Sequence, residues 1–498
     1  MGAFLTIPGA GRIGAAAARG PAYNTGMDRS TGRGAVLRLI LILAGLSALI
    51  CAPPVLSGLA ARARAGREMT AGQYASAMTS YRLAAERLPW QASLWEQAGE
   101  AAYLAGNIDN AVVLLDRGAG LGGLSAWGWT YLGMSYQAKG DTASAASAWR
   151  RALPLAEAYG FLAQAERKAG DLSAAVDDWR RSIAQEPDEA AAHYQLGLLL
   201  AATAPDQALP ELIRSAALNP YLDTTVESLR TSLNTALLSD DPGYQFVLSG
   251  RALGALGEWD LAAEAFRRAA ALRPDYADAW AWLGEARQHL GQDGSSDLEK
   301  ALALSPGSAL VQSLYGIYWQ RQGQPSRALA AYQSAAAIEP GNAAWLSAQA
   351  SAYEQSGDLV AALQYYENAV QLAPDDVSTW RALAEFSLRE NVDPAGVGYP
   401  AAQQLAALDK GDWQVLDLQG QLKLATGDFA AAEDLLKQAL AKAPRQAAPA
   451  LHLGMLYLST GNGASARAFL EQAASLDPEG PDGQQADRLL GQYFPASP

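Results

Sequence analysis

The sequence predicts an all-α solenoid of repeated helix pairs, preceded by one transmembrane or signal helix. Half of the 498 residues are apolar, and Ala and Gly dominate them, which favours helices packed closely through small side chains. A pattern of two amphipathic helices, with a glycine between them and a proline after them, recurs along most of the chain. A run of 23 residues without a charged side chain, 39–61, precedes these repeats.

Charge is unevenly distributed along the chain. The formal net charge is −14, but the first 68 residues carry eight Arg, no Lys and two acidic residues. The remainder therefore holds 29 basic and 49 acidic residues, a net charge of −20. Because such a surface repels phosphate backbones, we expect no nucleic-acid partner.

The N-terminal part is expected to be a disordered basic tail followed by a membrane or secretion signal. Residues 1–33 are rich in Gly, Ala and Arg and lack periodicity. We assign residues 34–61 to a transmembrane anchor or signal segment. Pro53 and Pro54 are expected to end the helix after Ile50. The single cysteine, Cys51, lies in this segment, so no intramolecular disulfide can form.

Two fates of this segment stay open, and Met27 is an alternative start of the chain. An uncleaved anchor would leave the protein in the membrane, whereas the small residues at 58–60 and 63–65 suit cleavage by a signal peptidase. Charge differs little between the two sides of the run. We expect a single-pass protein with an extracytoplasmic body; the alternatives are secretion after cleavage and a cytoplasmic body.

The repeat pattern is clearest at Ala343–Asp376. Ala350 and Tyr353 lie at helical spacing, Gly357 stops the first helix, and the period resumes until Pro374. The 34-residue length and these positions resemble the tetratricopeptide repeat (TPR), which implies a right-handed solenoid of helix-turn-helix repeats. The small residues mark where two helix backbones come close. Large residues, such as Trp149 and Trp179 in other repeats, are expected in the core.

About twelve degenerate repeats follow one another. We assign them to two sub-arrays, 62–220 and 243–478, which are joined by an irregular linking helix within 221–242. A helix and tail at 479–498 are expected to cap the last apolar face.

Four stretches depart from the pattern. Ala204-Pro205 replaces one glycine turn, and the second helix near 294–296 is expected to be shortened. Residues 391–400 are expected to form a longer loop before a helix at 401–409. The glycine-rich stretch 118–123 is interpreted as a turn between repeats, because no Lys-Ser/Thr pair follows it as in a phosphate loop.

Little in the sequence is suited to catalysis. His193, His289 and His452 lie in separate repeats, so a shared metal site or catalytic dyad is not expected. No stretch outside the repeats is long enough for an enzyme domain. We therefore expect no enzymatic activity, no cofactor and no metal.

In TPR proteins the inner face of the solenoid is built from positions around 2, 5, 9 and 12 of the first helix of each repeat. Here these positions carry Gln, Glu, Arg and apolar side chains, which suit an extended peptide. They are Glu96, Glu100, Thr130, Met134, Gln164, Arg167, Tyr194, Leu198, Arg251, Glu285, Gln288, Ile317, Gln320, Ser351, Glu354, Arg381, Glu385, Gln421 and Met455. Our candidate partner-binding residues are Gln164, Tyr194, Arg251, Glu285, Gln320, Arg381 and Glu385, together with Trp282, which we expect to face the groove.

The resemblance implies a scaffold for protein–protein interaction or complex assembly, and together with the uncharged run 39–61 and the lack of catalytic motifs it predicts a non-catalytic, membrane-tethered scaffold at the bacterial cell envelope. Expected partners are proteins or extended peptides in the groove, and the membrane through residues 39–61. One alternative is a self-assembling structural subunit of an envelope or appendage complex, which would be a homo-oligomer. Another is a protein that binds envelope polysaccharide or peptidoglycan through exposed aromatics such as Trp282.

Overall fold

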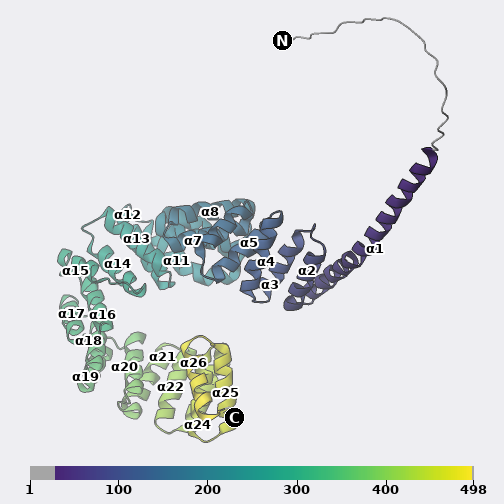
Figure 1. Ribbon diagram of the computed structural model, residues 1–498. Helices are drawn as coiled ribbons and strands as arrows, with labels where there is room; N and C mark the ends of the chain where they lie inside the picture. The colour runs from purple at the N-terminus through teal and green to yellow at the C-terminus, as the bar shows by residue number, and fades with distance from the viewer. Residues whose placement is uncertain (1–28, 496–498) are drawn as a thin grey trace, which may run out of the picture. The chain divides into compact units, whose positions relative to one another are not determined.

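The computed structural model describes residues 29–495, with side chains from residue 52 onward and at positions 39, 40 and 42. This part of the chain is helical and contains no strand, which confirms the all-α prediction for it. It divides into two compact units, the first ending at Ala165 and the second beginning at Glu166. Figure 1 labels most of the helices.

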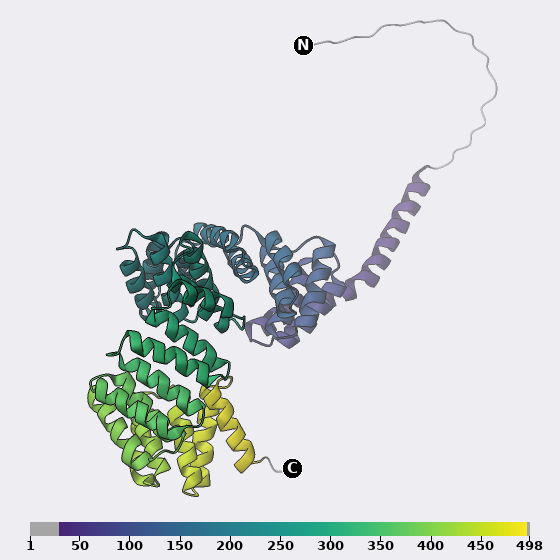
Figure 2. The ribbon, with the colours of Figure 1, turned by 90° about the vertical axis from the view of Figure 1, so that its left-hand side faces the viewer.

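Unit 1 is built from helices that alternate in direction along the chain (Figure 2). They are α1 (Arg29–Thr70), α2 (Tyr74–Arg87), α3 (Ser93–Leu104), α4 (Ile108–Leu121), α5 (Ala126–Ala138), α6 (Thr142–Ala152) and most of α7 (Ala156–Ala169).

Unit 2 continues the same alternation. Its elements are α8 (Leu172–Gln185), α9 (Ala190–Thr203), α10 (Pro205–Leu218), η1 (Pro220–Leu222), α11 (Asp223–Ala236), α12 (Pro242–Ala255), α13 (Trp259–Leu272), α14 (Ala277–His289), α15 (Ser295–Leu304), α16 (Ala309–Arg321), α17 (Pro325–Ile338), α18 (Ala343–Gln355), α19 (Leu359–Leu372), α20 (Val377–Arg389), η2 (Pro394–Gly398), α21 (Tyr399–Leu408), α22 (Trp413–Ala425), α23 (Phe429–Lys442), α24 (Ala447–Ser459), α25 (Gly463–Leu476) and α26 (Pro481–Tyr493).

The C-terminal part of α1 is the first helix of the first repeat. Ala61 and Ala65 are buried in one apolar cluster with residues of α2, and Arg87 Nη1 donates a hydrogen bond to Ser57 Oγ at 3.2 Å. A Cβ on Gly58 would lie 2.8 Å from Leu88 Cγ, so the two helices touch there. Residues 58–61, which the prediction assigns to the anchor or signal segment 34–61, therefore pack against α2.

α1 runs through Pro53 and Pro54, contrary to the expected break after Ile50. Each proline removes one backbone hydrogen bond. The helix continues beyond them because its next turns pack against α2.

The structure describes only part of the N-terminal region for which predictions were made. α1 begins at Arg29, inside the range 1–33 predicted to be disordered, and residues 1–28 lie outside the described part. Many side chains of the predicted membrane segment 39–61 also lie outside it. In what is described, no helix is both long and apolar enough to cross a membrane.

Most repeats share one turn between their two helices. In Ala343–Asp376, Gly357 has a φ of +83°, which a residue with a side chain adopts only at a cost. The next residue, Asp358, caps α19 by accepting a hydrogen bond from the backbone N–H of Ala361 at 3.0 Å. The same pair of roles recurs at Gly106-Asn107, Gly140-Asp141, Gly170-Asp171, Gly427-Asp428 and Gly461-Asn462.

Small residues on the first helix face large residues on the second, as the sequence predicts. A Cβ on Gly133 would lie 2.2 Å from Trp149 Nε1, and one on Gly316 would lie 2.4 Å from Tyr332 Cε1. The predicted core residues Trp149 and Trp179 are buried. Close packing of this kind fixes the distance between the two helices of a repeat.

The pattern is interrupted by η1 and α11, which lie within the range 221–242 predicted for a linking helix, except for Pro220. Beyond them, α12 and α13 pack against α9. Ser249 Oγ donates to the carbonyl of Ala201, and Arg268 Nη1 donates to the carbonyl of Thr203 at 3.2 Å. Every residue of α9 from Leu196 to Ala202 is consequently buried.

Two of the four predicted departures are confirmed. At Ala204-Pro205 the turn shrinks to one residue, because Ala204 ends α9 and α10 begins at Pro205. α15 is shortened to 10 residues, whereas α13 and α17 have 14.

The other two predictions are wrong. Residues 394–398 form the π-helical turn η2, which leads directly into α21, so 391–400 is not a loop. Within the stretch 118–123, α4 continues to Leu121. Gly118 is buried in that helix, since a Cβ there would lie 2.8 Å from Leu124 Cδ2.

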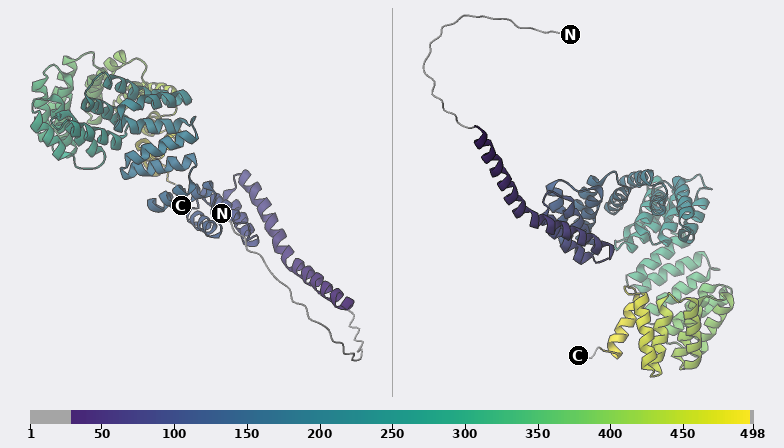
Figure 3. Two further views of the ribbon diagram at one scale, coloured as in Figure 1. Left: turned by 90° about the horizontal axis from the view of Figure 1, so that it is seen from above. Right: turned by 90° about the vertical axis from the view of Figure 1, so that its right-hand side faces the viewer.

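The last helix, α26, covers the end of the array. It lies beside α24 and α25 (Figure 3), and Ala486 is buried against Leu470 and Ala473. This helix falls within the range 479–498 predicted for a capping helix and tail.

Candidate functional site

The inner face of unit 2 carries polar contacts that each join one repeat to the next. It begins at α14, where the buried side chain of Glu285 accepts two hydrogen bonds from Arg321 of α16, each 2.7 Å long. His289 Nε2 lies 3.1 Å from the same carboxylate. We call this pair and the four that follow the polar ladder. They are Gln320–Ser351 (2.6 Å), Glu354–Arg389 (2.6 Å), Arg381–Asp412 (3.2 Å) and Asp417–His452 (2.9 Å).

Two of these side chains accept hydrogen bonds from buried tyrosines on the second helices of their repeats. The hydroxyl of Tyr332 donates to Gln320 Oε1 at 2.9 Å, and that of Tyr366 donates to Glu354 Oε2 at 3.1 Å. Burial raises the pKa of both phenols above the usual value, so they remain neutral donors at physiological pH. The ladder is therefore positioned by the core beneath it.

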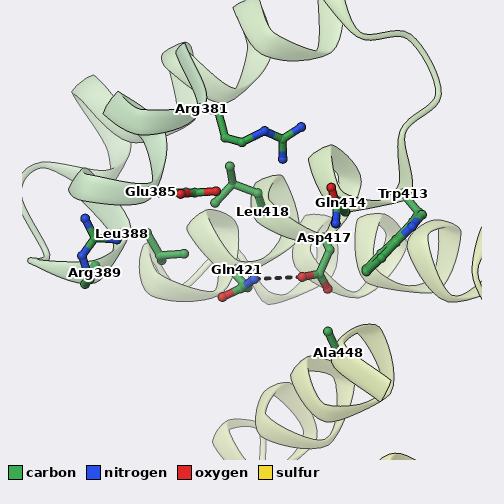
Figure 4. A pocket seen from close by; sticks show the side chains of 10 residues that line it. All are labelled: Arg381, Glu385, Leu388, Arg389, Trp413, Gln414, Asp417, Leu418, Gln421 and Ala448. Carbon is green, nitrogen blue, oxygen red and sulfur yellow. Dashed lines mark hydrogen bonds between the residues drawn. The ribbon is translucent and has the colours of Figure 1, made fainter. Parts of the chain in front are cut away.

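A pocket of about 560 Å³ lies at the C-terminal end of the ladder, between α20, α22 and α24. Figure 4 shows its side chains: Arg381 and Glu385 of α20 lie on one side, Ala448 of α24 on the other, and the α22 residues between them. The lining is Arg381, Glu385, Leu388, Arg389, Trp413, Gln414, Asp417, Leu418, Gln421 and Ala448.

The pocket combines apolar surface with hydrogen-bonding groups. Trp413, Leu388 and Leu418 supply the apolar part. Asp417 is held in place by His452 and by Gln421, whose Nε2 donates to it at 2.9 Å. Such a surface can bury one or two apolar side chains while it hydrogen-bonds the backbone that carries them.

The eight candidate residues do not form one site. Arg381 and Glu385 line the pocket together, and Glu285 and Gln320 belong to the polar ladder. Gln164 is exposed on the part of α7 that belongs to unit 1.

The remaining three candidates are Tyr194 of α9, Arg251 of α12 and Trp282 of α14. The guanidinium of Arg251 lies 5.3 Å from the ring centroid of Trp282, and Trp282 stacks on Phe266 with centroids 6.0 Å apart. Trp282 is therefore half-buried between neighbours, and its ring is not a free platform for a sugar. Tyr194 is half-buried on α9.

The predicted groove is not continuous, because the inner face of α9 is covered. Leu198, which the repeat positions assign to the groove, is fully buried. Arg167 forms ion pairs with Glu258 and Asp260, at the start of α13. Leu198 and Arg167 are therefore not open to a partner, because α12 and α13 pack back against α9 and the end of α7 after the linking helix.

Several pocket residues were missed although the sequence contains a signal for them. With Gly420 as the small residue at position 8 of its repeat, the missed residues Gln414 and Asp417 occupy positions 2 and 5, beside Gln421 at position 9, which the prediction included. The same count from Ala384 gives Leu388 position 12. Trp413 has no such signal, since position 1 is outside the rule.

Among the side chains that the structure describes, no group of three or more His, Cys, Asp or Glu could hold a metal ion.

Comparisons with known proteins point to the repeat family. Profiles described as "Tetratricopeptide repeat" match residues 162–222, 316–377 and 423–492, and one described as "TPR repeat" matches 250–291. No curated protein matches the chain.

Solved structures similar to this chain include yeast Tom70, with 16% identity and a TM-score of 0.42 over 87% of this chain and 95% of that one. The Cut9–Hcn1 hetero-tetramer of the APC/C matches with 13% identity and a TM-score of 0.42, covering 86% and 95%. A tetratricopeptide repeat protein from Parabacteroides merdae matches with 16% identity and a TM-score of 0.39, covering 50% and 97%. From the profile matches, residues 162–222, 250–291, 316–377 and 423–492 carry tetratricopeptide repeats.

Proposed function

We propose that this protein is a non-catalytic scaffold that binds an extended segment of a partner protein in the pocket between α20, α22 and α24. Proteins with tetratricopeptide repeats generally act in protein–protein interaction, and the repeats support this class of function. The observation that carries the proposal is the pocket itself, in which apolar side chains adjoin polar groups already fixed by the ladder.

The pocket residues have distinct roles in this proposal. Trp413 and Leu418 contact an apolar side chain of the partner, Gln414 offers its amide to the partner backbone, and Glu385 attracts a basic neighbour. Because the ladder fixes Arg381 and Asp417 before binding, little side-chain entropy is lost when the partner arrives.

A peptide library displayed on phage and selected against the full chain tests the proposal. The selected peptides should bind the Trp413→Ala variant at least tenfold more weakly, since aromatic anchors dominate such interfaces. Tyr221→Ala is the matched control, because Tyr221 is 93% exposed and far from the pocket in sequence. Selected peptides that bind wild type and Trp413→Ala equally would rule this pocket out.

We propose further that the segment before the first repeat tethers the scaffold to the membrane of a bacterial envelope, with the repeats outside the cytoplasm. The uncharged run in the sequence supports this. Even without residues 55–61, several of which contact α2, the run 39–54 would span about 24 Å as a helix, against about 30 Å for a bilayer core. Alkaline carbonate should leave the full chain in the membrane pellet and release a chain that starts at residue 53.

A further inference from the structure

A second pocket lies on a different face of unit 2, where a helix is one turn short. α15 has 10 residues, whereas the corresponding helices α13, α17 and α19 each have 14. The loop 291–294, which begins with Gly291 at a φ of +71°, takes the place of the missing turn. A pocket of about 530 Å³ lies between α15, α16 and α17.

The other shortened helix of unit 2, α21, shows that a shortened helix does not always leave a pocket. α21 also has 10 residues, but η2 precedes it. Val392 and Val397, within and beside this turn, pack into the apolar cluster of α18 to α22. The chain supplies no comparable segment ahead of α15, because only the loop 291–294 separates it from the end of α14 and the C-cap residue Leu290.

The floor of this pocket is aromatic. The rings of Tyr315 and Trp319 meet edge to face, with centroids 5.6 Å apart and planes at 83°. Both residues are half-buried, and the guanidinium of Arg327 lies 4.3 Å above the Trp319 ring. None of these residues lines the pocket between α20 and α24, so the two pockets are separate.

Polar groups stand on the walls around this floor. Gln312 uses one amide N–H to bind the carbonyl of Pro306 at 2.9 Å, which leaves its second N–H for another acceptor. Ser334 donates to the carbonyl of Ala330 at 3.0 Å, so its oxygen is available as an acceptor. Glu299 is exposed on the α15 wall.

We infer that this pocket binds a proline-containing extended segment of a partner protein, with a basic residue next to the proline. A proline ring packs against aromatic surface such as that of Tyr315 and Trp319, one face of which Arg327 covers. The polyproline II conformation leaves the peptide carbonyls free to accept from Gln312 and Arg327. Glu299 favours a basic neighbour, and the net charge of −20 beyond residue 68 disfavours an acidic partner.

The test uses the full chain and a fluorescent probe peptide of eight prolines interrupted by two arginines, with binding followed by anisotropy. A matched probe carries glutamate in place of arginine. Ala330→Phe places a large side chain at the exposed rim of the pocket and leaves Tyr315 and Trp319 themselves unchanged. Ala337→Phe is the control, because Ala337 is exposed on the same helix but does not line the pocket.

The inference expects the basic probe to bind and the acidic probe to bind at least tenfold more weakly. Ala330→Phe and Trp319→Ala should each lower the affinity for the basic probe at least tenfold, whereas Ala337→Phe should leave that affinity unchanged. Glu299→Gln should reduce the difference in affinity between the basic and the acidic probe. Trp413→Ala should have no effect, which separates this result from the fate of the pocket between α20 and α24.

Three results would overturn it. The first is equal binding of the basic probe to wild type and to Ala330→Phe. The second is tighter probe binding by a chain that lacks residues 1–28, which would make that segment, with its own prolines and arginines, the occupant. The third is a dimer by light scattering that Ala330→Phe dissociates, which would make a second copy the occupant.

Discussion

Glycines at the contact between the two helices of a repeat have no room for a side chain. In Gly133→Ala the new methyl would meet the Trp149 indole, so the helices must move apart or Trp149 must leave its place. We expect a loss of about 1–3 kcal/mol in local stability, seen as faster hydrogen exchange in α5 and α6.

Gly120→Ala is the matched control for that change. Gly120 also lies inside a helix of unit 1, but nothing lies within 4 Å of its Cβ position. Alanine should therefore stabilise α4 by about 0.5–1 kcal/mol through helix propensity. Equal slowing of exchange in both variants would show that the helices of this repeat are not in contact at Gly133.

Asp241 gives unit 2 a pH-dependent contribution to stability. Desolvation raises its pKa, but the backbone N–H groups of Tyr244 and Gly243 and the Arg273 guanidinium together hold it below the usual range. A lowered pKa means that the stabilisation is complete above the unfolded value, about 3.9, and is lost as pH falls through the folded value.

Asp241→Asn keeps an oxygen that can cap α12 but loses the charge. Its free energy of unfolding should be lower than that of wild type at neutral pH, and the difference should shrink as pH falls below about 4. Acid titrations of both proteins followed by circular dichroism measure this. A constant difference across that range would mean that the carboxylate charge is not the cause.

Turn chemistry at single residues was predictable only where glycine marks it. Asn391 has a φ of +53° at the place where other repeats have glycine, and Asn tolerates this conformation better than most residues. The stretch 391–400, which interrupts the repeat pattern, was predicted to be a loop. The Asn or Asp caps that follow the glycines were present in the sequence and were overlooked.

At the scale of elements, α1 joins the N-terminal segment to the repeats without a break. A chain that starts at residue 66, as cleavage after Ala65 would produce, lacks most of the helix that covers Tyr81 and Leu88. We expect the amides of α2 to lose protection from hydrogen exchange in that chain. A chain that starts at residue 53 should keep the protection, and equal exchange in both would remove α1 from the first repeat.

The helix pairs followed from the sequence, but the return of α12 and α13 onto α9 did not. Periodicity reports which face of a helix is apolar, not which distant helix covers it. The sequence of α9 does contain one signal of this contact. Its nearly unbroken apolar run Leu196–Ala202 is typical of a helix that is buried on all sides. The pocket residues Gln414 and Asp417 could have been predicted, because they occupy groove positions 2 and 5 of the repeat that begins with α22.

At the scale of the whole molecule, the negative charge of the repeats bears on self-assembly. Copies with a net charge of −20 over the repeats repel one another most strongly at low salt. We expect a chain that starts at residue 53 to be monomeric by size-exclusion chromatography with light scattering in about 50 mM salt. A defined oligomer that persists under these conditions would favour the structural-subunit alternative.

The contact of α9 with α12 and α13 restricts how this protein can evolve. In an ordinary solenoid each repeat touches only its neighbours, so whole repeats can be duplicated or lost without disturbing the rest. Here a repeat gained or lost between α9 and α13 would separate Ser249 from Ala201 and Arg167 from Asp260. Changes in repeat number should therefore be confined, among relatives of this protein, to the stretches before α7 and after α13.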